Sequence, residues 1–177
     1  IESLQNAPQS FFPVRDALGW LHTMNRDYPG ARAVLESTHP GFFDPVTRRE
    51  AIEEHTEAAC NIGYVMVQTG DQDTGRALVE DTIAYTTGQA AETTAQQIWI
   101  GNLHGCYAIV GDWDQSLQAM KLLYENGHFT GWWDRKFLEY FDPLRGDPRF
   151  EELMQSVSDE MARQRQSLAE QPELAGP

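Results

Sequence analysis

Few residues in this 177-residue sequence have the types and spacing that catalysis or metal binding requires. The five histidines are scattered, and none has a second ligand-type residue at a convincing metal-binding spacing. Glu54 and His55 are adjacent, so on a helix their side chains point in different directions. His104 falls inside a predicted helix, where a hydrogen-bonded structural role is the simpler interpretation. Catalysis by His104 with Asp112 would need a third group, which the sequence does not identify.

Sequence motifs of the common enzyme classes are not found. The chain has no HExxH zinc motif, no glycine-rich phosphate loop and no nucleophile elbow. Hard-metal sites usually converge from a loop or from several segments, so the acidic side chains of one predicted helix are better interpreted as exposed surface. These residues are Glu50, Glu53, Glu54 and Glu57. We therefore predict a chain that is not an enzyme, with no catalytic residue, no metal and no cofactor.

The two cysteines, Cys60 and Cys106, are too few for a disulfide framework and show no CxxC spacing. Both fall inside predicted helices. Because unpaired cysteine is usually buried, we interpret them as buried free thiols. A single disulfide is the alternative if the domain occupies an oxidising compartment.

Composition narrows the classes of partner. A hydrophobic content of 41% is enough for one domain with a core, and the net charge of −14 disfavours nucleic acid and suits a basic partner. No apolar run reaches the length of a membrane span, so we expect no direct membrane insertion by this segment. The sequence begins at Ile1, and we interpret it as a piece of a longer protein whose compartment, cytoplasmic or periplasmic, stays open.

Most of the chain carries the sequence signals of helices, and these helices must position the residues discussed above. A helix is predicted from Pro13 to Met24, and a short second helix from Pro29. A loop over 39–43 follows. Asp44-Pro45 is a strong start signal for a helix to about Thr69, because aspartate caps helices and proline suits their first position. No segment shows the sustained alternation of a strand.

A repeated Gly-Asp pair organises the rest of the chain. It occurs at Gly70-Asp71, Gly111-Asp112 and Gly146-Asp147. Glycine can end one helix in the left-handed conformation, and the aspartate can cap the next. Apolar residues three or four apart flank the first two pairs on both sides. We therefore predict two successive helix hairpins, whose apolar faces must be covered by stacking.

These hairpins resemble tetratricopeptide repeats, over roughly residues 56 to 165. The first matches the family pattern at Ile62-Gly63, Gly70 and Gly75, and the second at Leu103, Tyr107, Gly111 and Ser116. The sequence departs from the pattern in three ways. His104 stands where the family prefers glycine, Met66 stands where it prefers tyrosine, and the turn glycines are 41 residues apart (111 minus 70) against a period of about 34. The extra residues would lie near 86–94.

The C-terminal part resembles the closing segment of many bacterial tetratricopeptide regions. The similarity lies in Gly131-Trp132-Trp133-Asp134 and in residues 141–150. Such regions often end membrane-bound winged-helix regulators, adenylate cyclases or related signalling proteins. A last helix would start at Asp147-Pro148 and bury Phe150, Leu153, Met154 and Val157.

The resemblance implies an all-α fold, an antiparallel helical-hairpin array of about seven helices with a C-terminal capping helix. Residues 1–50 would form an N-terminal helical extension or a degenerate repeat. Residues 51–177 would hold the tetratricopeptide-like repeats and the capping helix, in one contiguous helical domain.

The resemblance also implies a function: a protein-interaction or scaffold domain of a larger bacterial regulatory or assembly protein, which binds a peptide or protein or self-associates. Family contact positions on the concave face include Glu57 and Cys60, and our candidates for partner binding are Tyr64, Val67, Gln68, Ile98, Gly101, Gly105, Ala108 and Ile109. None is Lys or Arg, which argues against capture of a chaperone's C-terminal carboxylate. Trp132 and Trp133 are candidate surface anchors, because tryptophan is favoured at interface hot spots.

Two alternatives remain open. Gly101, Gly105 and Ala108 form a small-residue stripe that suits either close helix packing or the close approach of a ligand. For the whole chain, the first alternative is a sensor domain that binds a small molecule between its helices, and a pocket near His104 or Trp132 with convergent polar groups would favour it. The second alternative is a non-catalytic portion of a larger enzyme.

Overall fold

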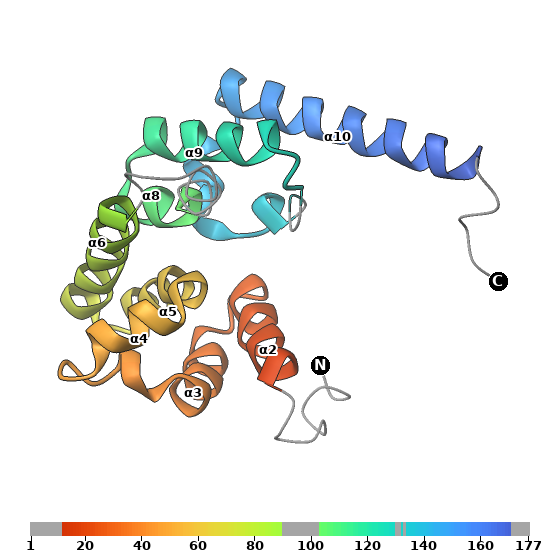
Figure 1. The fold of residues 1–177 in the computed structure, drawn as a ribbon. Helices are drawn as coiled ribbons and strands as arrows, with labels where there is room; N and C mark the ends of the chain where they lie inside the picture. Colours follow the sequence, from red (N-terminus) through yellow and green to blue (C-terminus); the bar gives the residue numbers. More distant parts are fainter. Residues whose placement is uncertain (1–11, 90–102, 130–131, 133, 171–177) are drawn as a thin grey trace.

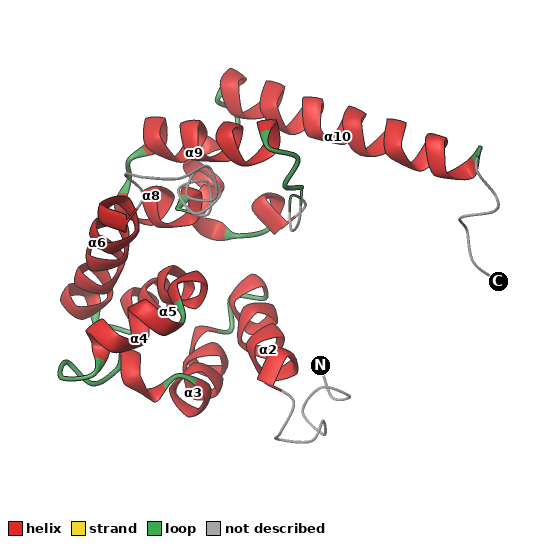
Figure 2. Ribbon diagram, viewed as in Figure 1, coloured by secondary structure: helices red, strands yellow, loops and turns green. Residues whose placement is uncertain are grey.

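The computed structural model describes residues 12–89, 103–129, 132 and 134–170. Within these residues every regular element is a helix, and none is a strand (Figure 2). The expected all-α class is confirmed.

Two N-terminal helices form as the proline positions predict. Helix α2 spans Phe12–Met24 and α3 spans Tyr28–Thr38. Asp27 caps α3 by accepting a hydrogen bond from the Gly30 amide at 3.1 Å, and Pro29 occupies the first turn, where its missing N–H costs nothing. The second carboxylate oxygen of Asp27 lies 2.8 Å from Nδ1 of His22, which ties the end of α2 to the start of α3.

The expected single helix from Asp44-Pro45 to about Thr69 is wrong. The structure has a 3-10 helix η1 (Pro40–Phe42) within the expected loop, then α4 (Arg48–Glu54) and α5 (Thr56–Gln68). Asp44 accepts a hydrogen bond from the Val46 amide at 2.9 Å, so it closes a turn and caps no helix. His55 breaks the helix with φ −138° and ψ 48°. The break puts its ring 5.0 Å from the ring of buried His39.

The first predicted hairpin is α5 with α6 (Gln72–Gln89). Gly70, in the turn, has φ +102°, a conformation that favours glycine. The two helices cross at Gly63 and Gly75. A Cβ atom at Gly63 would lie 2.8 Å from the Gly75 carbonyl oxygen, so the backbones meet without side chains between them.

The second predicted hairpin is α8 (His104–Val110) with α9 (Trp113–Glu125). Gly111 has φ +84°, and Asp112 caps α9 by accepting a hydrogen bond from the Gln115 amide at 3.2 Å. Ser116 donates a hydrogen bond to the His104 carbonyl oxygen at 2.8 Å. The small residue expected at position 116 therefore links α9 to α8 through a hydrogen bond.

After α9 the chain forms two 3-10 helices, η2 (Asp134–Lys136) and η3 (Glu139–Leu144), before α10 (Pro148–Ala169). Asp147 caps α10, as the third Gly-Asp pair predicts. The first half of α10 buries Phe150, Met154 and Val157, and Leu153 is partly buried. The second half runs outward, beyond the rest of the fold (Figure 1).

The N-terminal helices share a core with the first hairpin. Ala31 and Leu35 of α3 pack in one cluster with Ile62 and Val65 of α5 and with Leu78 of α6. A second cluster joins Tyr64 to buried residues of α9, η3 and α10. Helix α5 therefore contacts both halves of the molecule.

Candidate functional site

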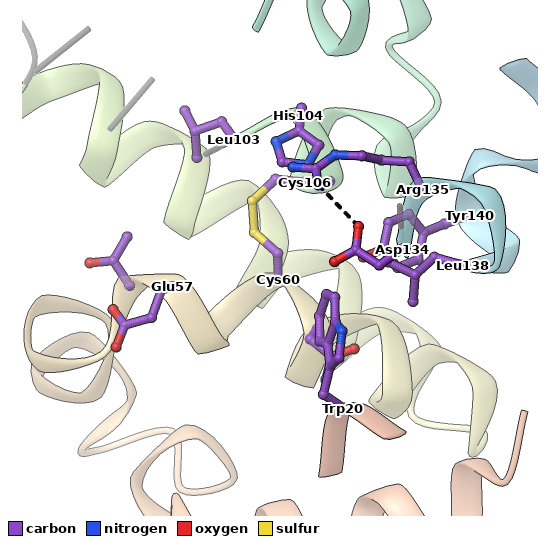
Figure 3. A pocket seen from close by; sticks show the side chains of 13 residues that line it. Trp20, Glu57, Cys60, Leu103, His104, Cys106, Asp134, Arg135, Leu138 and Tyr140 are labelled. Atoms are coloured by element: carbon purple, nitrogen blue, oxygen red, sulfur yellow. Dashed lines mark hydrogen bonds and ion pairs between the residues drawn. A yellow bond between two sulfur atoms is a disulfide. The ribbon is translucent and has the colours of Figure 1, made fainter. Parts of the chain in front are cut away.

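A cavity of about 300 Å³ lies where α2, α5 and α8 meet the η2–η3 segment (Figure 3). We call it the inter-hairpin pocket. It is lined by Trp20, Thr56, Glu57, Cys60, Asn61, Leu103, His104, Gly105, Cys106, Asp134, Arg135, Leu138 and Tyr140. These residues come from four separate stretches of sequence, which only the folded chain brings together.

The two cysteines form a disulfide in the wall of this pocket. Cys60 on α5 bonds to Cys106 on α8 across a Cα–Cα distance of 5.2 Å (Figure 3). The interpretation as free thiols is wrong, and the alternative of a single disulfide holds. The bond links the two hairpins directly, because α5 belongs to the first and α8 to the second.

Asp134 and Arg135 form a buried ion pair on the opposite side of the cavity. Nη1 of Arg135 donates to Oδ1 of Asp134 at 3.1 Å, and Arg135 is only 4% exposed. Its guanidinium also lies 5.8 Å from the centroid of the Tyr124 ring. Burial raises the pKa of the Asp134 carboxyl, while the adjacent Arg135 charge opposes this shift. Such a pair fixes one negative and one positive group at the pocket edge.

Asn61 brings a polar side chain into the apolar face of α5. It is 6% exposed, and its Oδ1 atom has no hydrogen-bond partner among the described protein atoms. A buried acceptor left without a partner costs about 1–3 kcal/mol. Asn61 also lines the inter-hairpin pocket, and a ligand donor that reached Oδ1 from the cavity would relieve this cost.

Aromatic groups form the remaining wall. Trp20 reaches the cavity from α2, and Tyr140 enters it from η3 (Figure 3). Burial raises the pKa of the Tyr140 hydroxyl, so this side chain stays neutral. The His104 ring stacks on Phe141, with centroids 5.7 Å apart and ring planes 7° from parallel. Its position beside the pocket results from structural packing.

The predicted partner-binding residues of α5 lie in different environments. Tyr64 is 6% exposed, and its ring packs edge-on against Tyr28 at 5.7 Å and Tyr140 at 4.9 Å. Val67 is half-buried and Gln68 is exposed. Tyr64 therefore packs within the fold, and only Gln68 of these three is freely accessible.

The predicted residues of the second hairpin also lie largely inside the fold. Ala108 is buried in the core, and Ile109 is half-buried against two core clusters. Gly105 is buried and lines the inter-hairpin pocket, where an added Cβ atom would lie 3.6 Å from the Tyr140 ring. Of the residues in the small-residue stripe, Gly105 thus borders both packed side chains and the cavity. Ile98 and Gly101 lie outside the described residues.

Trp132 is half-buried and packs against the core cluster that contains Met154. The Lys136 ammonium lies 5.1 Å from the centroid of its ring. Trp133, the other predicted anchor, lies outside the described residues.

Asn61, Asp134 and Arg135 are among the pocket residues to which the sequence reasoning assigned no role in binding. For Asn61 a signal existed, because it interrupts the apolar run from Ala58 to Met66. No such signal marks Asp134 and Arg135, since neighbouring opposite charges are ordinary on protein surfaces and only the fold buries them.

The part of the chain that the structure describes contains no group of three His, Cys, Asp or Glu side chains placed to hold a metal ion. No helix in that same part is both long and apolar enough to cross a membrane. The pocket instead offers hydrogen-bond acceptors and aromatic surface, an arrangement suited to binding.

Comparison of the chain with protein-family models, with curated proteins and with solved structures gives no match. The pocket geometry therefore carries the functional argument.

Proposed function

We propose that this chain is a sensor domain that binds a small molecule in the inter-hairpin pocket. The cavity of about 300 Å³ falls at the lower end of the range of ligand pockets, roughly 300–1,000 Å³. Such sites combine apolar walls with a few convergent polar groups. Leu138 and Trp20 supply apolar walls in this pocket, and Asn61 and Asp134 supply polar groups.

The unpartnered oxygen of Asn61 is the observation that carries this proposal. An apolar side chain of the same shape would satisfy packing at that position without leaving a buried acceptor unpaired. A ligand that donates a hydrogen bond to Oδ1 accounts for the polar residue. The ligand would also touch α2, α5, α8 and η2, so its binding would favour one packing of these elements over others.

A thermal-shift screen of metabolites on the full chain tests the proposal. A ligand at 100 times its Kd stabilises the folded state by about 2.7 kcal/mol, which corresponds to a rise in Tm of roughly 5–10 °C for a chain of this size. We expect at least one compound to give such a shift with the wild type. The shift should persist in Gln68→Leu, a change at an exposed residue of α5, and fall to about half or less in Asn61→Leu. An equal shift in Asn61→Leu, or no shift with any compound, would contradict the proposal.

Protein interaction is the second candidate, in the form of a tetratricopeptide-like array that binds a protein or peptide or self-associates. Support comes from the successive hairpins and from the outward half of α10, where Leu168 is 57% exposed. Sedimentation velocity of the wild type and of Leu168→Glu tests the self-association form. An oligomer lost in Leu168→Glu supports it, and a monomer at all concentrations counts against it.

A further inference from the structure

We propose that the inter-hairpin pocket selects small organic ammonium ions, that is, protonated amines carried on an apolar or aromatic skeleton. This inference rests on the proposed ligand-binding function and specifies the chemistry of the ligand. It draws on the acceptors, the charge balance and the aromatic wall of the cavity.

The polar groups that line the cavity include acceptors on Asn61 and Asp134, beside donors such as Thr56. Oδ1 of Asn61 is buried without a partner. The Asp134 carboxylate faces the disulfide across the cavity, whereas Glu57 of α5, also in the lining, lies on the other side of the disulfide (Figure 3). A ligand that satisfies these oxygens must donate hydrogen bonds, and an ammonium group donates three and accepts none.

The charges of the lining favour a cation. Asp134 and Glu57 are negative and Arg135 is positive, which leaves an excess of one negative charge with His104 counted as neutral. Arg135 donates to Asp134, so these two charges balance each other and the excess negative charge is that of Glu57. The net charge of −14 for the whole chain adds a field that attracts cations and repels anions. A carboxylate or phosphate ligand would be repelled by the excess negative charge of the lining and by the net charge of the whole chain.

The walls favour an organic cation over a bare metal ion. Trp20 and Tyr140 present aromatic surface, and a cation within about 6 Å of such a ring is attracted by its quadrupole. Leu103 and Leu138 offer apolar surface for a carbon skeleton. Calcium would instead require six to eight oxygen ligands, and the described residues offer no cluster of three ligating side chains.

Three probes that share one skeleton separate charge from shape: benzylamine, benzyl alcohol and benzoate. Their binding to the full chain is measured at neutral pH by calorimetry and by the shift in Tm. We expect benzylamine, as its ammonium form, to bind most tightly, benzyl alcohol more weakly and benzoate not at all. The Kd for benzylamine should rise about tenfold or more in Asn61→Leu, since a hydrogen bond to a charged group is lost. It should rise roughly two- to fivefold in Glu57→Gln, the loss expected for an exposed charge.

Two controls separate a ligand-binding role from a structural one. Glu80→Gln removes an exposed charge of α6 outside the pocket and should leave the Kd unchanged. Asn61→Leu should raise the Tm of the ligand-free protein, because it removes an unpaired buried acceptor, whereas a residue needed for the fold would lower it.

The outcomes test two claims separately: that the pocket binds a ligand, and that it selects ammonium ions. If benzoate or benzyl alcohol binds as well as benzylamine, and Asn61→Leu abolishes that binding, selection for ammonium is overturned while the pocket stands. If benzylamine binds wild type and Asn61→Leu equally, or does not bind the wild type, the inference is overturned. If in addition no compound of the metabolite screen gives a shift that Asn61→Leu reduces, the proposed function is contradicted as well.

Discussion

Gly63 and Gly75 determine how closely α5 and α6 pack. A Cβ atom at Gly75 would lie 2.9 Å from the backbone nitrogen of Val67, and one at Gly63 would lie 2.6 Å from a methyl group of Val79. Real Cβ atoms do not approach neighbours this closely, so the two helices can meet only where both residues lack a side chain. The sequence indicated small residues at these positions through the repeat pattern, but only the structure shows that they face each other.

Substitutions of glycine in α6 should separate the effect of packing on stability from the effect of helix propensity. Alanine favours a helix over glycine by about 1 kcal/mol, but overpacking costs about 1–3 kcal/mol and more where backbone must move. We therefore expect Gly75→Ala to lower the free energy of unfolding by about 2 kcal/mol. Gly88→Ala, in the same helix with nothing within 4 Å of the added Cβ, should raise it by about 0.5–1 kcal/mol.

Urea unfolding of the two variants measures both effects. If Gly75→Ala proved as stable as Gly88→Ala, the close approach of the two backbones would be refuted.

The polar residues of the pocket could not be predicted from the sequence, whereas the capping residues could. The capping role of Asp112 and Asp147 follows from local sequence, because a cap involves only the next three residues. The roles of Asn61 and Asp134 do not, because their burial depends on elements far along the chain. Local patterns therefore predicted the turns and missed the binding groups.

Among the elements, the starts of α2, α3, α9 and α10 agree with the predicted ones to within a residue, because proline and aspartate mark them. The break between α4 and α5 was missed. The residues around it, Glu53-Glu54-His55-Thr56, include no glycine or proline, and the apolar residues Ile52 and Ala59 on either side keep a helical spacing. The break is a tertiary effect, in which the His55 ring packs against buried His39.

The capping aspartates of α3 and α10 should make the free energy of unfolding depend on pH in the acidic range. The Gly30 amide, followed by His22, lowers the pKa of Asp27 below its ordinary value of 3.8. Arg149 lowers the pKa of Asp147 through its side chain and backbone. A carboxyl whose pKa is lowered by folding contributes stability above its unfolded pKa, and loses it as the pH falls through the folded value.

The double variant Asp27→Asn/Asp147→Asn keeps a capping oxygen at both sites but no charge. We expect its urea midpoint to fall less than that of the wild type between about pH 5 and about pH 2. An identical fall in both proteins would show that these two carboxylates do not contribute to the acid sensitivity.

The disulfide is the covalent link between elements of the two hairpins. It closes a loop with a sequence separation of 46 residues. Loop-closure entropy for such a length corresponds to about 4 kcal/mol of stabilisation at 25 °C. We expect Cys60→Ser/Cys106→Ser to unfold at lower urea by up to this amount, and a reducing agent to destabilise the wild type but not the variant.

An equal response of both proteins to the reducing agent would show that the sulfurs are not bonded in solution. The pairing could not be derived from the sequence, because two cysteines on different helices become neighbours only after the hairpins stack.

At the scale of the whole molecule, the sequence predicted the class of fold and the two hairpins, because each depends on spacings within about 40 residues of chain. The inter-hairpin pocket depends on α2, α5, α8 and η2 together. No periodicity links these segments, so the cavity and its acceptors appear only in the folded chain. The same stacking buries Tyr64 and Ala108, which the resemblance to tetratricopeptide repeats implied as contact residues for a partner.

The charge of the whole chain also has a functional consequence. With a net charge of −14, the molecule attracts cations at long range, and salt screens that attraction. In our proposal, the pocket adds specificity at short range through Asn61, Asp134 and Trp20.

An NMR titration of the ¹⁵N-labelled full chain with benzylamine tests ligand binding in the pocket most directly. The resonances of the Asn61 side-chain amide and the Trp20 indole N–H should shift first and saturate together, because both groups line the cavity. Resonances of the exposed residues of α10 should stay in place. Shifts spread over the exposed acidic residues, with Asn61 and Trp20 unchanged, would contradict the account.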